Sequence, residues 1–221
     1  MTDSEPNIAA PGGRRAEARR QQVIDTARLL FSDNGFHATG IAQVAKQSGV
    51  AVGQIYRDFA SKEDIVAAIV AADCANFMAA ESLKEAVERG DRNSVRDWVH
   101  SFVDPQSRDA DGRMFAEILA ESSRNERIAA IFAGVQSEAR ANMLTALGLL
   151  APGDAMAARR LILAETILAL SLGLMQHGVM NPGRNLDDLV AALTRIVDRE
   201  IDDLDQACPG ASPSSPTPSS R

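Results

Sequence analysis

The stretch from Thr39 to Asp64, TGIAQVAKQSGVAVGQIYRDFASKED, decides the fold of this chain. It reads as two short helices joined by a tight turn and followed by the start of another helix. The small side chain of Ala45 lets the two helices cross closely, and Gly49 can adopt a left-handed backbone conformation at the turn. Apolar side chains behind the turn come from Val44, Val50, Ile55 and Phe59. The spacing predicts a helix-turn-helix, whose second helix enters the major groove of DNA.

The residues on either side of this motif also predict helices. From Arg14 to Asn34, apolar side chains recur on one helical face, and Gly35 is a natural stop after that helix. Thr39 is placed to cap the second helix. Ser61 and the carboxylate three residues later form a capping-box pattern at the start of a long helix, which we expect to reach about Val87.

Beyond Gly90 the pattern predicts five more helices and no strand. Pro105, Pro152–Gly153 and Pro182–Gly183 mark the connections. The expected ranges are Asp91–Val103, Gly112–Ser122, Asn125–Leu149, Asp154–Val179 and Leu186–Asp205. Ala and Leu dominate the chain and aromatic residues make up only 4%, which also favours helices over sheets. The predicted fold class is all-α.

Charge is distributed unevenly along the 221 residues. The net charge is −7, which by itself argues against a nucleic-acid partner. From Arg14 to Lys62, however, eight basic residues stand against four acidic ones, and the remainder of the chain is acidic. Because salt limits the reach of each charge to about 8 Å, a locally basic module on an acidic body can still bind phosphate.

Other functional classes leave no pattern in the sequence. Cys74 and Cys208 fit no metal or redox spacing and are expected to be reduced thiols of a cytoplasmic protein. The N-terminus lacks the apolar segment of a signal peptide. Because we find no catalytic constellation, metal-ligand cluster or phosphate-binding loop, we expect no enzyme activity, metal site or cofactor.

The chain resembles the TetR family of transcriptional regulators from Arg14 to about Val70. The resemblance rests on LFSDNGFHATGI, SGVAVGQIYRDF and SKEDIVAAIV, and the later segment FAEILAESSRNERIAAIF looks like mid-domain sequence of that family. It implies an N-terminal three-helix helix-turn-helix DNA-binding domain and a C-terminal helical ligand-binding and dimerisation domain. It further implies a homodimer that releases its double-stranded DNA operator when a small-molecule effector binds.

The expected domains follow from the motif and the resemblance together. The DNA-binding domain is expected at 14–60, and the helical effector-binding and dimerisation domain at 61–205. A polar arm at 1–13 and a Pro/Ser-rich tail at 206–221 are expected to be disordered.

The recognition helix is expected at Val52–Phe59. Gln54 can read adenine with two hydrogen bonds or donate to guanine, and Arg57 can read guanine or hold a phosphate. Gly53 lets the backbone approach the duplex closely, and the Tyr56 hydroxyl can reach a phosphate. Gln54 and Arg57 could instead be ordinary solvated positions, and Tyr56 could serve packing alone.

Further DNA contacts follow from the resemblance. Lys62 matches a phosphate contact of the family, and Thr39 and Gln43 lie where the family grips the DNA backbone. The predicted DNA contacts are Thr39, Gln43, Val52, Gly53, Gln54, Tyr56, Arg57 and Lys62. A basic arm near the duplex, or a merely solvated cluster, is formed by Arg14, Arg15, Arg19 and Arg20.

Two positions depart from the family pattern. Ala51 stands where Ser or Thr is common, so the recognition helix lacks a side-chain cap, at a cost of roughly 1 kcal/mol. Asp58 stands where an aromatic residue or His is common. An acidic group near phosphate is unfavourable unless it faces away or pairs with a base such as Arg57.

The segment Leu161–Met180 is apolar, but Glu165, Gln176 and His177 interrupt it. Its uninterrupted apolar run is too short for a membrane span, which needs about 20 residues. A helix that is apolar on most faces must be buried on most sides. We therefore expect the last two helices, at about 159–179 and 186–205, to form a homodimer interface. A core helix in a monomer is the alternative.

An effector pocket between the helices of the body is physically plausible, although large apolar residues at helical spacing more often form core. The candidate pocket residues are Phe77, Trp98, Phe102, Met114, Phe115, Met143 and His177. The leading functional prediction is a ligand-released repressor. The alternatives are an activator, a DNA-binding regulator controlled by a protein partner, an enzyme with a DNA-binding module and a purely structural helical protein.

Overall fold

The computed structural model describes residues 11–104, 112–181 and 183–207, with the side chains of residues 11, 12 and 74–77 left out. Every regular element in these ranges is a helix, so the all-α prediction is confirmed. The chain forms two compact units. The first lies within Met1–Met78 and Asp109–Gln136, and the second within Ala79–Arg108 and Ser137–Arg221.

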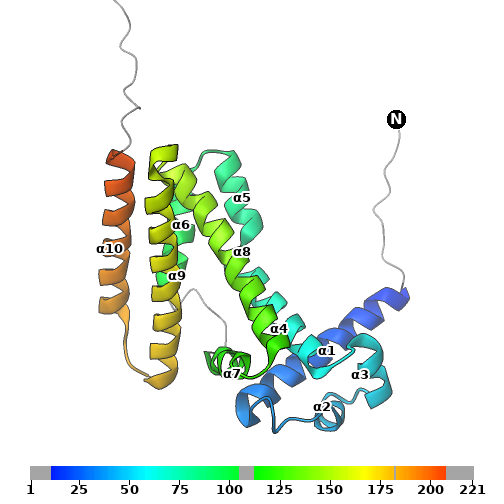
Figure 1. Cartoon of the computed structure of the whole chain (residues 1–221). Coiled ribbons are helices and arrows are strands. Elements are labelled where there is room, and N and C mark those ends of the chain that lie inside the picture. Colours follow the sequence, from blue (N-terminus) through cyan, green and yellow to red (C-terminus); the bar gives the residue numbers. More distant parts are fainter. Residues whose placement is uncertain (1–10, 105–111, 182, 208–221) are drawn as a thin grey trace, which may run out of the picture. The chain divides into compact units, whose positions relative to one another are not determined.

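The first unit combines N-terminal helices with helices from the middle of the chain (Figure 1). Its elements are α1 (Pro11–Asn34), α2 (Ile41–Ser48), α3 (Val52–Asp58), α4 (Lys62–Met78), α7 (Gly112–Ser122) and the first part of α8 (Glu126–Leu150). Their apolar faces share one core, in which Phe31, Ile55, Ile65 and Ile128 are almost fully buried. Burial of such side chains stabilises the fold by about 1.5–3 kcal/mol each.

The turns around the helix-turn-helix agree with the sequence except at Thr39. Gly35 and Gly49 have φ angles of 83° and 71°, in the left-handed region that favours glycine. The capping residue of α2 is Gly40 and not Thr39, so that prediction was wrong. Thr39 is fully buried, and its hydroxyl donates to the carbonyl oxygens of Leu30 in α1 and of Gly35 just after it. Ser61 does form the predicted capping box, since its hydroxyl accepts from an amide three residues later and its own amide donates back.

The long helix expected up to Val87 is two helices. Helix α4 ends at Met78, and α5 (Ala80–Glu88) follows after Ala79. Ala79 has a φ angle of 39°, a left-handed conformation that interrupts helical hydrogen bonding. The sequence prediction missed this break because neither Gly nor Pro marks it.

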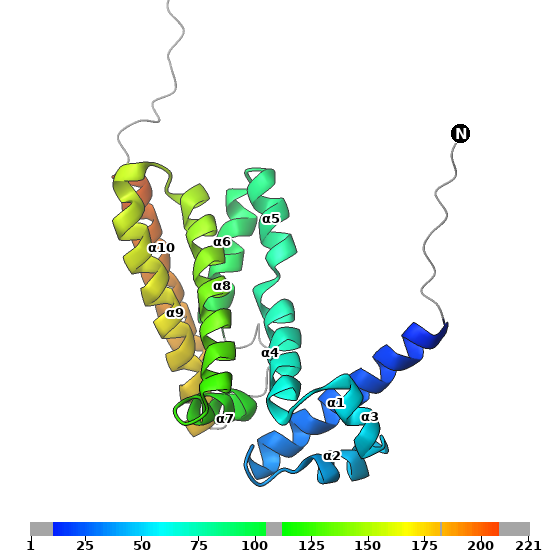
Figure 2. The same ribbon diagram turned by 45° about the vertical axis from the view of Figure 1, so that its right-hand side comes forward.

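The second unit contains the remaining helices. Its elements are α5, α6 (Arg92–His100), the 3-10 turn η1 (Ser101–Val103), the rest of α8, the 3-10 turn η3 (Asp154–Met156), α9 (Ala157–Met180) and α10 (Asp187–Gln206). Apart from the α4–α5 break, the helices lie within a few residues of their expected ranges. Helices α9 and α10 run side by side in both ribbon views (Figures 1 and 2).

Only part of the expected arm at 1–13 and of the expected tail at 206–221 falls within the described residues. Helix α1 begins at Pro11, inside the expected arm 1–13, and α10 includes Gln206 of the expected tail. Residues 1–10 of the arm and 208–221 of the tail lie outside the described residues. Packing also joins α4, α7 and the start of α8 to the helix-turn-helix, whereas the boundary near residue 60 is a functional division that stays a prediction.

Helix α9 is buried along one face. Its buried residues include Leu163, Ile167 and Leu174, whereas Leu161 and Ile162 are exposed. Residues 154–180 are long and apolar enough to cross a membrane by length and composition, a test that the core helix of a soluble protein also passes. The one-sided burial leaves an apolar face on the second unit.

A row of ion pairs joins α6 to α10. The Arg92 guanidinium pairs with Asp205 at 2.6 Å, and Arg96 bridges Asp198 and Asp202 at 2.7 Å each. Arg92, Arg96 and His100 follow one another on α6 at intervals of one helical turn. Because the aspartates of α10 lie on one face of that helix, each basic group of α6 meets an acidic one.

His100 extends this row, because its Nε2 lies 2.8 Å from the carboxylate of Asp198. Partial burial disfavours the charged carboxylate, but the hydrogen bonds and charges of Arg96 and His100 outweigh it and lower the pKa of Asp198.

Asp198→Asn is expected to lower the free energy of unfolding most at neutral pH. A carboxylate with a lowered pKa stabilises the fold above its unfolded-state pKa of about 4, and this contribution is lost as the pH falls through the folded-state value. Denaturant titrations at neutral and acid pH should therefore show wild type and variant converging in acid. The control is Asp203→Asn, at an exposed carboxylate on the same helix; an equal effect of both variants contradicts the role of the ion pairs.

Candidate nucleic-acid interface

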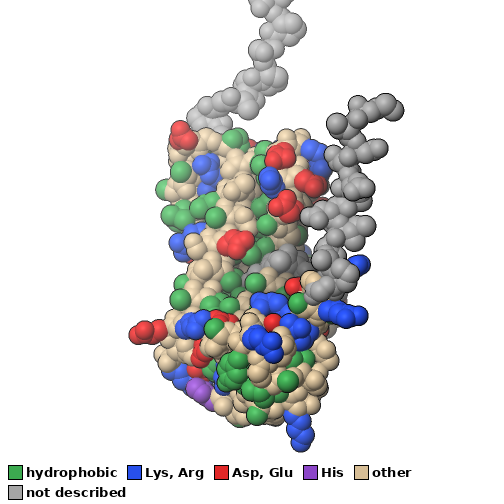
Figure 3. Space-filling view, turned by 90° about the vertical axis from the view of Figure 1, so that its right-hand side faces the viewer, with side chains coloured by type: hydrophobic (Ala, Val, Ile, Leu, Met, Phe, Trp, Pro, Cys, Tyr) green, Lys and Arg blue, Asp and Glu red, His purple; other side chains and the backbone are tan. Residues whose placement is uncertain are grey.

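Helix α3 presents most of its side chains to solvent. Ile55 is fully buried and anchors the helix to the core, whereas Val52, Tyr56 and Arg57 are exposed. Lys and Arg side chains gather over the part of the first unit that carries α1 and α3 (Figure 3). A short helix that is anchored by a single buried residue and exposes its polar side chains has the form required to enter a DNA groove.

The backbone of α3 is open where it begins. A Cβ atom added at Gly53 would meet no atom within 4 Å, so packing inside the protein does not require a glycine there. Ala51 precedes the helix and provides no side-chain cap, as predicted. Ala51 therefore offers no side-chain acceptor to the first amides of the helix, and the Gln54 amide donates to the Ala51 carbonyl at 2.8 Å instead.

The other predicted DNA contacts around α3 differ in accessibility. Gln43 on α2 is exposed and Gln54 is half-buried. The Arg57 guanidinium makes one long hydrogen bond, of 3.4 Å, to the Gly53 carbonyl and is otherwise directed to solvent. The Gln43 and Arg57 side chains are thus free to bind a duplex with little rearrangement, whereas the Gln54 side chain hydrogen-bonds to the Asp58 carboxylate.

Thr39 and Lys62 are engaged inside the protein. The Lys62 ammonium donates to the carbonyls of Phe36 at 2.6 Å and Thr39 at 3.1 Å, and it lies 3.9 Å from the centre of the Phe36 ring. Burial lowers the pKa of Lys62. With the Thr39 hydroxyl fully buried and Lys62 half-buried, both side chains hold the connection between α1 and α2 in this conformation, and their role as phosphate contacts stays a prediction.

Asp58 is paired, but not with Arg57. Arg19 on α1 donates to both of its carboxylate oxygens, from Nε at 2.8 Å and from Nη2 at 3.0 Å. This hydrogen bonding lowers the pKa of Asp58. Arg20 donates to the Asp58 backbone carbonyl at 2.9 Å. Two of the four arginines predicted to form an arm or a solvated cluster thus bind the end of α3.

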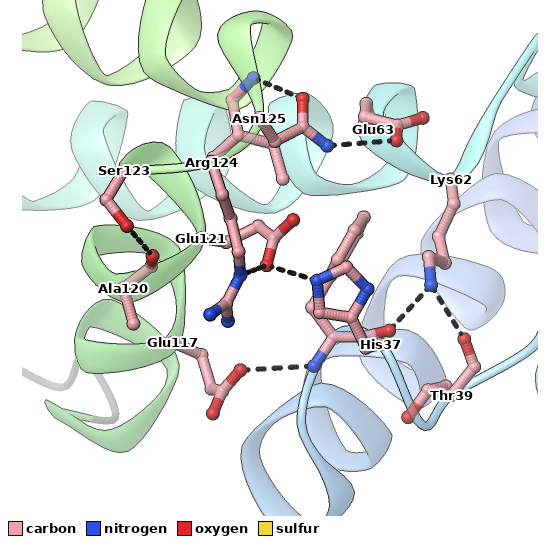
Figure 4. Close-up of polar contacts among 12 residues, drawn as sticks. His37, Thr39, Lys62, Glu63, Glu117, Ala120, Glu121, Ser123, Arg124 and Asn125 are labelled. Carbon is pink, nitrogen blue, oxygen red and sulfur yellow. Dashed lines mark hydrogen bonds and ion pairs between the residues drawn. The ribbon is translucent and has the colours of Figure 1, made fainter.

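Helix α7 grips the same α1–α2 connection from its other side (Figure 4). The Glu117 carboxylate accepts from the Phe36 amide at 3.1 Å. Glu121, only 1% exposed, pairs with His37 at 2.9 Å and with Arg124 at 2.8 Å. Sequence reasoning missed this contact because the partners are about 80 residues apart and each looks like an ordinary surface charge.

The start of α8 binds the start of α4 within the same unit. Asn125 donates to the Glu63 carboxylate at 3.3 Å, and Arg127 pairs with Asp64. Together with the contacts of α7, these bonds tie the helix-turn-helix to residues from the middle of the chain.

The candidate ligand residues do not come together in one group. Met114 and Phe115 belong to the first unit, where Phe115 packs on Phe132 with ring centres 5.8 Å apart. Trp98 and Phe102 belong to the second unit and pack on each other at 4.8 Å.

The remaining candidates divide in the same way. Met143 is fully buried in the second unit, and His177 lines a shallow apolar depression between α9 and α10. The Phe77 side chain lies outside the described residues. Most of the described candidates are therefore core residues in this conformation, and their role in ligand binding stays a prediction.

Two family models match the chain. Residues 23–69 match the model of bacterial regulatory proteins of the tetR family. Residues 91–204, more than half of the chain, match the model of the C-terminal part of BetI-type transcriptional repressors.

Individual relatives agree with these matches. The HTH-type transcriptional regulator UidR of Escherichia coli K12 is 31% identical over 118 residues, which are 52% of this chain and 58% of UidR. HbdR of Aromatoleum sp. strain CIB is 44% identical over 50 residues, 23% of this chain and 22% of HbdR. The chain thus spans less than two thirds of either relative.

Solved structures share the fold at low sequence identity. A proposed transcriptional regulator from Pseudomonas aeruginosa PAO1 superimposes with a TM-score of 0.69 at 20% identity, over 86% of this chain and 92% of that one. A TetR transcription regulator from Haloarcula marismortui gives 0.65 at 14% identity, over 85% and 98%. These likenesses concern the fold alone.

Lys62→Met is expected to lower the free energy of unfolding by about 1–3 kcal/mol, because it leaves two carbonyl oxygens without their charged donor. Denaturant titration measures the effect. Lys46→Met, at an exposed lysine on α2, is the matched control. A stability equal to that of the control variant would mean that the ammonium is free to serve DNA instead.

Proposed function

Because the chain belongs to the TetR family of bacterial transcriptional regulators, we propose that it is a repressor that binds a pseudo-palindromic operator as a homodimer. We further propose that a small-molecule effector releases it from DNA and that it acts in the cytoplasm. The observation that carries this proposal is the exposed polar face of α3, fixed to the core by Ile55.

The operator is contacted by α3 in this proposal. Gln54 and Arg57 read base edges in the major groove, and the Tyr56 hydroxyl and Gln43 bind phosphates. Val52 and the open backbone at Gly53 allow close approach to the duplex. Basic side chains on the same part of the unit supply the sequence-independent attraction, so that binding weakens as salt rises.

The dimer forms through α9 and α10 in this proposal. Ile162 on α9 is 67% exposed and Ile196 on α10 is 51% exposed. A depression lined by Leu170, Leu174 and Leu189 lies between the two helices. A second copy that packs on this face would bury the apolar side chains, and a twofold dimer matches an operator with two half-sites.

Repression is favoured over activation by the C-terminal half. Residues 91–204 match the model of BetI-type transcriptional repressors. The activator FasR of Mycolicibacterium smegmatis is also similar, at 28% identity over 108 residues, or 47% of this chain and 49% of FasR. Activation, or control by a protein partner, is therefore the second candidate. Deleting the gene of a repressor raises expression of a reporter under the operator, whereas deleting the gene of an activator lowers it.

Release by an effector requires that the ligand bind better to a conformation that does not bind DNA. The contacts of α7 with the α1–α2 connection support such a response, because they link residues outside the helix-turn-helix to its geometry. Large apolar residues of the second unit, such as Trp98 and Phe102, remain the candidates for pocket residues.

Selection of bound sequences from random duplex DNA is expected to yield a pseudo-palindrome, and Arg57→Ala should weaken binding to it by about 1–3 kcal/mol if Arg57 reads a base. Fluorescence anisotropy at two or more salt concentrations measures the loss. Arg89→Ala, at an exposed arginine just after α5, removes the same charge elsewhere. Equal affinities of the two variants would remove Arg57 from the interface, and failure to select any sequence would refute DNA binding.

Ile162→Glu is expected to convert the dimer into a monomer, because a charge would be buried in the proposed interface. Sedimentation equilibrium measures the mass, and the operator affinity should fall with it. Leu29→Glu, at a leucine on α1 that is 58% exposed, is the control for introducing a glutamate elsewhere. A variant that stays dimeric places the interface on another surface.

A further inference from the structure

The C-terminal end of α3 is bound by two consecutive arginines of α1. Arg19 donates hydrogen bonds to both carboxylate oxygens of Asp58, and Arg20 donates one to the Asp58 backbone carbonyl. The Arg20 guanidinium also lies 4.3 Å from the centre of the Phe59 ring, just beyond the helix. Side chain, backbone and following aromatic ring are therefore all held from α1.

Such contacts matter because α3 is weak by itself. It has seven residues and no side-chain cap at its start. An isolated helix shorter than about 12 residues is marginal in water. The last carbonyls of any helix lack partners within the helix, and cationic side chains stabilise this end. Arg20 satisfies one of these carbonyls, and the fork of Arg19 fixes the direction of the helix through Asp58.

Because Arg19 pairs with Asp58, its guanidinium is not available to bind a phosphate in this conformation. Its guanidinium is committed to a two-pronged pair, with the arginine side chain 30% exposed and the aspartate side chain 16% exposed. Arg15, one helical turn earlier on α1, is exposed. Neighbouring arginines on one helix thus have different surroundings, which the sequence does not reveal.

We propose that Asp58 and Arg19 are positioning residues for DNA recognition: their pair sets the orientation in which α3 presents Gln54 and Arg57 to the bases. The proposal rests on the proposed function, since it assumes that α3 reads the operator. Asp58 lies one residue from Arg57 and one helical turn from Gln54, so a tilt of this end of the helix displaces both side chains.

A positioning role and simple electrostatics predict opposite effects of Asp58→Asn on operator affinity. An acidic group close to phosphate repels the duplex, so neutralising it as Asp58→Asn would tighten binding if charge alone mattered. If Asp58 positions the helix, the same change weakens binding to the operator. Arg19→Gln should weaken it as well, without changing the salt slope, whereas loss of a phosphate contact reduces the slope by about one.

The first test compares operator affinity and its salt dependence in the full-length chain. We expect Asp58→Asn and Arg19→Gln each to lose roughly tenfold in affinity, and the double variant to lose no more than either, because the pair acts as one unit. Arg19→Lys, which keeps the charge but not the fork, should lie between wild type and Arg19→Gln. Arg15→Gln removes an exposed charge of α1 without breaking the pair, and is the control for the loss of charge alone. Tighter binding of Asp58→Asn, additive losses or a reduced salt slope of Arg19→Gln would overturn the proposal.

The second test needs no DNA. Amide hydrogen exchange of the free protein should quicken within α3 in both single variants, and more than within α2, because only the held end of α3 is released. Unchanged protection of α3 would overturn the positioning role, even if the variants bind DNA less tightly. A wild type that binds no duplex would refute the proposed function instead, while the exchange rates would still decide whether the pair orients α3.

Discussion

Helix α3 has seven residues, too few for a helix to be stable alone in water, and the contacts around it depend on this constraint. Helix α3 contributes Ile55 to the core and leaves its other side chains largely outside, so burial fixes its position but not fully its direction. The remaining orientation comes from polar contacts at its C-terminal end, where α1 supplies Arg19 and Arg20. A helix that exposes most of its surface is therefore held here by one buried residue and by contacts at its C-terminal end.

The same need explains the contacts at the α1–α2 connection. Its backbone groups are satisfied by charged side chains from two directions, with Lys62 binding carbonyls and Glu117 binding the Phe36 amide. Buried backbone groups must find partners, and charged partners make the stronger hydrogen bonds. Because one of these partners comes from α7, the geometry of the DNA-binding helices depends on residues far along the chain. The proposed release by an effector would need such a link between the DNA-binding helices and residues outside them.

The positions of charged and apolar side chains on the surface matter more than their overall numbers. A chain of net charge −7 can carry a basic face because salt screens distant charges. Within that face the arginines are not equivalent, since Arg19 is neutralised by Asp58 whereas Arg15 and Arg57 are exposed. In the second unit, α9 buries one side and exposes residues such as Ile162 on another. Counting residue types gives neither of these distinctions.

The sequence by itself determined what depends on local pattern. Helical periodicity, the glycines at positions 35 and 49 and the capping box at Ser61 are short-range signals, and they identified the all-α fold, the helix-turn-helix and the family resemblance. Only the tertiary structure decided that Thr39 is buried, that Lys62 binds backbone carbonyls and that Asp58 pairs with Arg19. It alone also decided that the chain breaks its helix at Ala79 and that α7 joins the N-terminal unit. Except for Ala79, which neither Gly nor Pro marks, these features join side chains to groups that are distant in the chain or reached only through a turn, and such partners are chosen by packing rather than by spacing.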